Sequence, residues 1–145
     1  ANIFDKLIVC VMVNAGKNPM FTLEERVELI RRVTGGVSNV EADMSSELLS
    51  DYAKRKRATM VVKGLRAVSD FEQEVQMAMI NSKINPDLDT VFFPSSEKYT
   101  YLSSSVAKEL ARYHANLDEF LPREIIDDVK NKLEIRSDEC DGRQR

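Results

Sequence analysis

Cysteine and histidine are scarce in this chain, which has two cysteines and one histidine among 145 residues. Cys10 lies in an apolar run and Cys140 in a polar stretch near the end, so we expect no disulfide between them. The only histidine is His114, and no Cys/His cluster surrounds it in the sequence. The composition therefore excludes a disulfide-rich scaffold and gives no indication of a zinc site.

Long apolar runs and an excess of one charge are also missing. No apolar run approaches the roughly 20 residues of a membrane span. The formal net charge is −3, so the composition does not indicate nucleic acid or a membrane surface as a partner. Residues 1–6 lack the basic stretch and the apolar core of a signal peptide. We therefore expect a cytoplasmic protein with no nucleic-acid or membrane partner.

The chain does have regularly alternating apolar patterns. Residues 7–13 form a continuous apolar run, which is typical of a parallel strand buried on both faces. Further strands are predicted around residues 40, 60 and 92, and helices are predicted over 22–35, 46–56, 69–84, 106–113 and 122–133. The alternation predicts an α/β fold, a doubly wound parallel sheet with helices on both faces. We expect one domain over residues 1–135 and a polar, disordered tail over residues 136–145.

Two sequence patterns mark predicted helix starts. Thr22-Leu23-Glu24-Glu25 and Ser69-Asp70-Phe71-Glu72 both have a hydroxyl residue three positions before a glutamate. In such a capping box the hydroxyl accepts a hydrogen bond from the backbone of the glutamate, whose carboxylate reaches back to the cap residue. The patterns predict Thr22 and Ser69 as the N-caps of two helices, and Gly35-Gly36 is expected to end the first of them.

Three loops carry cations or hydroxyl groups where a ligand is expected in this fold class. Ligands bind beyond the carboxyl ends of parallel strands. The loops that follow predicted strands there are residues 14–19 with Lys17, residues 63–66 with Lys63 and Arg66, and residues 95–105 with three consecutive serines. Such groups suit phosphate oxygens. Together the loops predict a site for a phosphorylated ligand.

Each of these features also has a plain structural alternative. Ser103, Ser104 and Ser105 precede a helix, whose free N–H groups attract anions. One of these serines could equally serve as an N-cap with the other two tolerated. Lys63 and Arg66 could be cations of a solvated turn, and a single loop lysine such as Lys17 is usually only a surface residue.

The predicted helix over residues 69–84 has two apolar sides. One consists of Phe71, Val75, Ala78 and Met79, and the other of Met77, Ile80 and Ile84. One side should cover the sheet. The second side should contact another subunit and, in part, a ligand. A helix that is buried on both sides within the monomer is an equal alternative. His114 follows a helix end, where we expect it to interact with the helix dipole.

Three blocks of the sequence resemble bacterial phosphopantetheine adenylyltransferases. They are KNPMFTLEER at 17–26, KGLRAVSDFEQE at 63–74 and YLSSSVAKE at 101–109. The blocks have the order and spacing of that family, and the resemblance extends over residues 1–134. The second block is highly specific, whereas the serine block is shared in looser form by the wider nucleotidyltransferase superfamily.

The resemblance implies a Rossmann-like nucleotidyltransferase fold and a specific reaction. The family transfers the adenylyl group of ATP to 4′-phosphopantetheine, which gives dephospho-coenzyme A and pyrophosphate in coenzyme A biosynthesis. Mg²⁺ takes part, and the acceptor phosphate attacks the α-phosphorus directly without a covalent enzyme intermediate. The resemblance further implies a homohexamer, coenzyme A as a feedback inhibitor, and no metal ligand from the chain itself.

The resemblance also assigns site residues. Lys17 corresponds to the lysine that binds the phosphate of phosphopantetheine and the transition state. Arg66 corresponds to the arginine that binds the ATP phosphates. These two are the expected catalytic residues. Lys63 stands where the family usually has an arginine, so a cation remains but bidentate geometry is lost. Gln73 replaces a frequent tyrosine and receives no role. The residues expected along phosphopantetheine are Lys17, Leu48, Leu49, Lys63, Met77 and Ile80. Those expected at ATP are Lys63, Gly64, Arg66, Glu74, Tyr99, Thr100, Tyr101, Leu102, Ser103, Ser104 and Ser105.

One family feature has no counterpart in the sequence. The family begins with a strand, a glycine-rich turn and a T/H-x-G-H motif, whereas residues 1–6 match the end of its first helix. His114 cannot replace the motif histidine, because it lies elsewhere and lacks the glycine. We expect the sequence to omit about twenty residues, since loss of a central strand would leave both neighbouring strands exposed.

Two other functions remain open from the sequence. One is another nucleotidyltransferase of the superfamily, for example one that acts on nicotinamide mononucleotide. The other is a noncatalytic module that binds a nucleotide or coenzyme A, which the absence of the histidine motif makes a real alternative.

Overall fold

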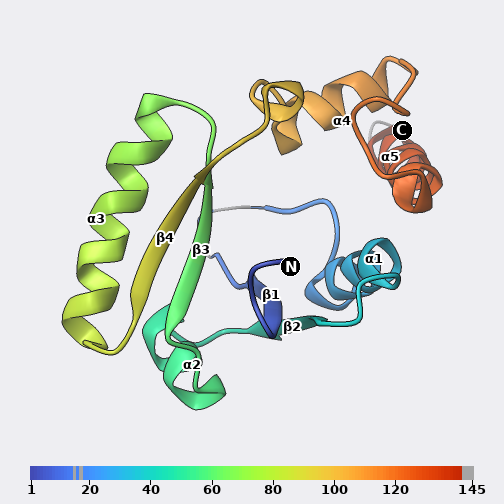
Figure 1. Ribbon diagram of the computed structural model, residues 1–145. Coiled ribbons are helices and arrows are strands. Elements are labelled where there is room, and N and C mark those ends of the chain that lie inside the picture. The colour runs from blue at the N-terminus through green and yellow to red at the C-terminus, as the bar shows by residue number, and fades with distance from the viewer. Residues whose placement is uncertain (15, 17, 142–145) are drawn as a thin grey trace. The chain divides into compact units, whose positions relative to one another are not determined.

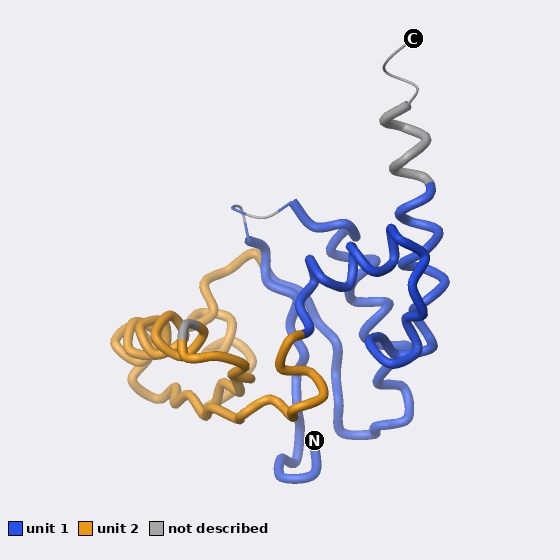
Figure 2. The backbone as a smooth tube through the Cα atoms, turned by 90° about the horizontal axis from the view of Figure 1, so that it is seen from above, with its two compact units in different colours: residues 1–45, 102–145 blue, residues 46–101 orange. Residues whose placement is uncertain are grey.

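The computed structural model describes residues 1–14, 16 and 18–141, with the backbone alone at residue 69 and residues 135–141. The described chain divides into two compact units (Figure 2). Unit 1 contains residues 1–45 and 102–145, and unit 2 contains residues 46–101. In chain order, the main elements are β1 (Leu7–Met12), α1 (Leu23–Thr34), β2 (Val40–Ser45), α2 (Leu49–Lys56), β3 (Met60–Leu65), α3 (Val68–Ile84), β4 (Asp89–Pro94), α4 (Ser104–Arg112) and α5 (Ile126–Asp141).

The alternating strands and helices confirm the predicted α/β, Rossmann-like fold class. All strand pairing among the described residues is parallel: β1 pairs with β2, and β3 pairs with β4. These pairs form two separate two-stranded sheets, one in each unit. The expected absence of a central strand, and the expected single domain, stay predictions.

The sheet of unit 1 carries α1 on one face. Leu7 pairs with Val40 and Met12 with Ser45 at the two ends of the register. Val11, Val27 and Ala42 are buried together between the sheet and α1. This packing accounts for the side of β1 that faces α1, because those side chains meet an apolar side of the helix.

The predicted capping box at Thr22 is confirmed. The Thr22 hydroxyl oxygen accepts a hydrogen bond from the Glu25 backbone N–H at 3.2 Å. The Glu25 carboxylate in turn accepts from the Thr22 N–H at 2.7 Å. The helix ends at Thr34, directly before Gly35, as the sequence predicts.

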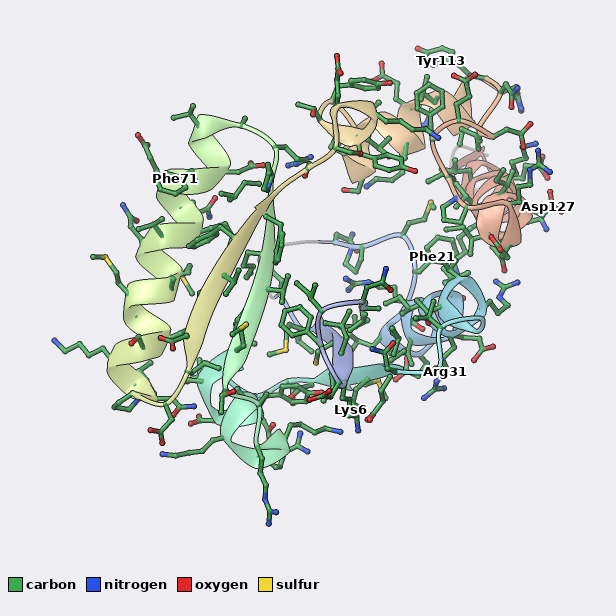
Figure 3. The ribbon with its side chains drawn as sticks, viewed as in Figure 1. Lys6, Phe21, Arg31, Phe71, Tyr113 and Asp127 are labelled. Atoms are coloured by element: carbon green, nitrogen blue, oxygen red, sulfur yellow. The ribbon has the colours of Figure 1, made fainter. Side chains whose placement is uncertain are left out.

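A second apolar cluster in unit 1 joins α4, α5 and the segment before α1. Its buried members are Met20, Ala111, Leu117, Ile126 and Val129. Phe21 packs against this cluster, and Figure 3 shows it beside α1. These contacts hold the C-terminal helices against the rest of the unit.

Two ion pairs join α1 to α5 at the surface. The Arg32 guanidinium lies 2.7 Å from the Asp128 carboxylate. The Lys132 ammonium lies 2.6 Å from the Glu25 carboxylate, and this hydrogen bond, with that from the Thr22 backbone, lowers the pKa of Glu25 below its ordinary value. Glu25 therefore caps α1 and also binds α5.

The helix α5 continues to Asp141, beyond the predicted end near Leu133. It thus runs into the segment 136–145 for which disorder was predicted. The sequence has no proline or glycine between Pro122 and Gly142, so it has no residue that would break the helix earlier. Residues 142–145 lie outside the described part of the chain.

In unit 2, α3 lies along the sheet formed by β3 and β4 (Figure 1). The rings of Phe71 on α3 and Phe92 on β4 meet edge to face, with centroids 6.0 Å apart; Phe71 is labelled in Figure 3. Leu88, directly before β4, is only 1% exposed. The Asn85 side chain donates to the Ser50 carbonyl at 3.4 Å and so connects the end of α3 to α2.

The predicted start of α3 at Ser69 is wrong. The helix begins at Val68, and its N-cap is Ala67, whose side chain makes no capping hydrogen bond. The Phe71 N–H donates to the Ala67 carbonyl at 3.3 Å, which starts the helix earlier than the capping pattern indicated. None of the helices in the described residues has the length and apolar composition needed to cross a bilayer.

Candidate functional site

The structure places most of the predicted site residues in unit 2. These are Leu48, Leu49, Lys63, Gly64, Arg66, Glu74, Met77, Ile80, Tyr99, Thr100 and Tyr101. Leu102, Ser103, Ser104 and Ser105 belong to unit 1. Lys17 lies outside the described residues. The expectation that the three loops meet around one ligand therefore stays a prediction, and each part is described by itself.

Lys63 lies near the carboxyl end of β3 on the face that α3 covers. Side chains of β3 alternate between half-buried and exposed, and Lys63 is among the half-buried ones. Its ammonium nitrogen lies 3.0 Å from a carboxylate oxygen of Glu74 on α3. The two residues assigned to ATP by resemblance are thus paired with each other.

Arg66 lies in the short connection between β3 and α3. Its Nε donates to the Asp70 carboxylate at 3.1 Å. Asp70 lies in the first turn of α3, four residues before Glu74, so the two carboxylates share one side of that helix. Both predicted phosphate-binding cations of unit 2 therefore contact carboxylates on the same side of α3.

Asp70 was not among the residues predicted for the site from the sequence. Its signal in the sequence was the four-residue spacing from Arg66, which places an arginine and a carboxylate within reach of each other. The sequence had indicated Asp70 only as a member of the capping pattern that begins at Ser69.

Gly64 leaves open space above β3. A Cβ atom built on Gly64 would meet only the Ser95 hydroxyl oxygen, at 3.7 Å, among the described residues. That distance is an ordinary van der Waals contact, so the fold itself does not require glycine here. A requirement for glycine would have to come from the close approach of a ligand to the backbone.

The segment after β4 carries two exposed tyrosines. Residues Glu97–Tyr99 form one turn of 3-10 helix, and the Thr100 hydroxyl donates to the Ser96 carbonyl at 3.2 Å. The Lys98 ammonium lies 5.4 Å from the centre of the Tyr99 ring. Tyr99 and Tyr101 remain available for stacking against a planar ligand, since both are exposed.

The three serines have different roles at the start of α4. Ser103 is the N-cap, and its hydroxyl oxygen accepts a hydrogen bond from the Val106 N–H at 3.2 Å. The structural alternative for one serine is therefore correct. Ser104 and Ser105 form the first turn and are exposed, and first-turn N–H groups lack intrahelical partners. The backbone N–H and hydroxyl groups of Ser104 and Ser105 are therefore of the kind that binds an anion.

The apolar residues expected along phosphopantetheine lie on α3 and at the start of α2. Leu48 is 63% exposed, Met77 45% and Ile80 50%, whereas Leu49 is half-buried. Ile84, on the same predicted side of α3 as Met77 and Ile80, is also exposed. The second apolar side of α3 therefore has surface left for a ligand or another subunit. Met79, which was grouped with Phe71, Val75 and Ala78 on the other predicted side, is 70% exposed and so is not buried against the sheet.

His114 terminates α4. Its backbone is left-handed, with a φ angle of 55°. The His114 N–H donates to the Ala111 carbonyl and the Ala115 N–H to the Leu110 carbonyl, the two hydrogen bonds of a Schellman motif. An exposed residue in this position has a structural role at the helix end.

A metal-binding cluster is absent from the described residues: no three His, Cys, Asp or Glu side chains there are arranged to hold an ion. The nearby carboxylates of Asp70 and Glu74 contact Arg66 and Lys63. Both carboxylates thus take part in ion pairs within unit 2.

Comparison with known proteins gives consistent matches. A family model described as cytidylyltransferase-like matches residues 1–110. The phosphopantetheine adenylyltransferase of Caldanaerobacter subterraneus subsp. tengcongensis is 48% identical over 133 residues, which cover 92% of this chain and 83% of that protein. The protein of the same name from Alkaliphilus metalliredigens is 48% identical over 132 residues, covering 91% of this chain and 84% of the relative. That from Clostridium botulinum strain Eklund 17B is 47% identical over 135 residues, covering 93% and 85%.

Proposed function

The chain belongs to the phosphopantetheine adenylyltransferases of the cytidylyltransferase-like family, and we propose that it transfers the adenylyl group of ATP to 4′-phosphopantetheine. The products are dephospho-coenzyme A and pyrophosphate, in coenzyme A biosynthesis. The observation that carries this proposal is the near 50% identity with relatives of that name over more than nine-tenths of the chain.

The reaction needs positioning and charge neutralisation. The acceptor phosphate attacks the α-phosphorus of ATP and pyrophosphate leaves, so no protein nucleophile takes part. Arg66 supplies a planar fork and Lys63 a point charge for phosphate oxygens at the end of β3. Gly64 between them lets the backbone approach the phosphates, because no Cβ stands in the way.

Other residues bind the remaining parts of the two substrates. Lys17 binds the phosphate of phosphopantetheine and the transition state. The N–H and hydroxyl groups of Ser104 and Ser105 bind the triphosphate at the start of α4. Glu74 contacts the ribose and adenine. The residues proposed to line ATP on the segment before α4 are Tyr99, Thr100, Tyr101, Leu102 and Ser103, and those proposed along the pantetheine arm are Leu48, Leu49, Met77 and Ile80.

Mg²⁺ enters as part of the ATP substrate. The described residues hold no cluster of three metal-binding side chains, and Mg²⁺ commonly binds through substrate phosphates with few protein ligands. The ion neutralises phosphate charge in the complex with ATP. The residues of this chain bind and orient that complex.

Assembly, regulation and location follow from the family resemblance. We propose a cytoplasmic homohexamer that coenzyme A inhibits. The exposed apolar side chain of Ile84, which is not assigned to the pantetheine arm, supports a subunit contact on α3. Light scattering of the purified protein would test the hexamer, and a monomer at micromolar concentration would contradict it.

A substrate panel tests the proposed reaction. Pyrophosphate release is measured with MgATP and, in separate reactions, 4′-phosphopantetheine, nicotinamide mononucleotide or no acceptor. We expect release only with 4′-phosphopantetheine. Release only with nicotinamide mononucleotide would identify another nucleotidyltransferase, and binding of ATP by calorimetry without release would identify a noncatalytic module.

A further inference from the structure

The contact between Arg66 and Asp70 has a specific geometry. Arg66 lies after the last residue of β3, Leu65, and before the first residue of α3, Val68. The guanidinium is engaged through Nε, 3.1 Å from Asp70 Oδ2. Asp70 is itself favoured in the first turn of α3, because a carboxylate interacts well with the positive end of the helix dipole. The carboxylate thus gives the arginine a contact on a rigid element.

An arginine that binds phosphate gains from such a contact. Its long side chain has many rotamers, and fixing them at the moment of binding costs conformational entropy. A guanidinium has five N–H donors, so one carboxylate at Nε and a phosphate at the other nitrogens can be bound at the same time. A contact through Nε therefore directs the side chain without using all of its donors.

Although the helix dipole favours Asp70, its carboxylate would by itself disfavour the binding of ATP nearby. Its negative charge repels the phosphates of ATP at short range. The ion pair is partly exposed, with side chains 39% and 29% accessible, and such pairs contribute little to folding stability. The helix also begins with Ala67 as its N-cap and does not depend on a side-chain cap. Positioning of Arg66 is the role that offsets the repulsion.

We propose that Asp70 is a positioning residue that holds the Arg66 guanidinium at the end of β3 for the phosphates of ATP. Asp70 acts through Arg66 and does not itself contact the reacting atoms. This inference rests on the proposed function, in particular on the role of Arg66.

The two possible roles of Asp70 predict opposite effects on ATP. If Asp70 were only a nearby negative charge, its removal would reduce repulsion and raise kcat/KM for ATP. If it positions Arg66, its removal lowers kcat/KM for ATP in spite of the reduced repulsion. Glu72→Gln serves as the matched control, because Glu72 is an exposed carboxylate of the same helix and removing it changes charge alone.

The experiment measures kcat and KM for ATP in the full-length protein and in five variants: Asp70→Ala, Asp70→Asn, Glu72→Gln, Arg66→Ala and the double variant Arg66→Ala/Asp70→Ala. We expect Asp70→Ala to lower kcat/KM for ATP by about tenfold or more, the scale of a misplaced binding group. Asp70→Asn retains an oxygen acceptor and should recover part of the loss. Glu72→Gln should be unchanged or slightly better than wild type.

The double variant decides whether Asp70 acts through Arg66. We expect it to be no worse than Arg66→Ala alone, since the group that Asp70 positions is then absent. Thermal unfolding checks that each variant is folded, and Asp70→Asn replaces Asp70→Ala in the comparison if the latter is not. The inference is overturned if Asp70→Ala resembles Glu72→Gln, or if the losses in the double variant add. Failure of the wild type to release pyrophosphate would instead reject the proposed function.

Discussion

Lys63 and Glu74 form an ion pair in which the ammonium nitrogen lies 3.0 Å from the carboxylate. By resemblance both residues belong to the ATP site, the lysine at the phosphates and the glutamate at the ribose and adenine. In the structure each is the partner of the other, so neither charge is isolated on the half-buried face of β3 and α3. On the proposed assignment of both residues to ATP, binding would change the partners of both side chains.

This pairing predicts non-additive substitutions. Lys63→Met removes a phosphate-binding cation and leaves Glu74 uncompensated, so kcat/KM for ATP should fall by about tenfold to 100-fold, the value of a charge-assisted hydrogen bond. The double variant Lys63→Met/Glu74→Gln should lose less than the sum of the two single losses, with a coupling energy of about 1 kcal/mol or more. Steady-state kinetics of all four proteins gives the coupling, and strictly additive losses would show that Lys63 and Glu74 act on ATP independently of each other.

Arg66→Ala tests the second cation. We expect turnover to fall by about 100-fold or more, the range for loss of a preorganised charge partner. Lys54→Ala, which removes an exposed cation of α2, is the control for net charge. Turnover of Arg66→Ala close to that of the control would refute the assigned role.

Gly64→Ala separates the demands of the fold from those of the ligand. The structure has room for the methyl group, with the Ser95 hydroxyl oxygen at 3.7 Å from the added Cβ. The free energy of unfolding should be unchanged or should rise by about 0.5–1 kcal/mol, because alanine loses less backbone entropy than glycine when it folds into a strand. Affinity for ATP should fall if phosphates approach this backbone. Denaturant unfolding and calorimetry measure the two quantities, and unchanged ATP affinity would contradict the close approach.

The Glu25 carboxylate predicts a pH dependence of stability. The Lys132 hydrogen bond lowers its pKa in the folded protein below the ordinary value of 4.5. Because the pKa of Glu25 is lower in the folded than in the unfolded protein, its ionised carboxylate stabilises the fold at pH values above the unfolded pKa. This stabilisation is lost as the pH falls through the folded pKa. Glu25→Gln should therefore reduce stability at neutral pH and flatten the loss of stability below about pH 4.5. Denaturant unfolding from pH 7 to pH 3 measures this, with Glu24→Gln as the control. Parallel curves for wild type and Glu25→Gln would count against the pairing.

His114→Gly should stabilise the protein. Non-glycine residues pay a steric cost at the positive φ angle of 55° that His114 adopts. Glycine removes that cost, and we expect a gain of about 0.5–1 kcal/mol in the free energy of unfolding. Activity should not change, since His114 is exposed at a helix end. A loss of turnover in a stable His114→Gly protein would indicate a catalytic role and would contradict this prediction.

Local patterns in the sequence were sufficient to predict some elements of the fold. The Thr22 capping box and the helix end before Gly35 involve residues close in the chain, and both were predicted from the sequence. The continuous apolar run at residues 7–13 likewise predicted β1 and its parallel pairing. Such features depend on short-range hydrogen bonds and on hydrophobic period.

Features that depend on competing partners were harder to predict. The pattern at Ser69 had the spacing of a capping box, yet the helix begins at Val68 and the Asp70 carboxylate contacts Arg66. The pairing of Lys63 with Glu74 joins a strand to a helix, and no local pattern specifies it. Resemblance assigned these residues to a ligand, but it could not indicate the contacts that they make with each other.

The most direct measurement of the central claim follows the phosphorus atoms of ATP. The full-length protein is given 4′-phosphopantetheine and ATP labelled in either the α- or the γ-phosphate, and the products are separated. The proposed adenylyl transfer predicts the α-label in dephospho-coenzyme A and the γ-label in pyrophosphate, in equal amounts. A γ-label in the acceptor, or no label transfer with the substrates bound, would contradict the account.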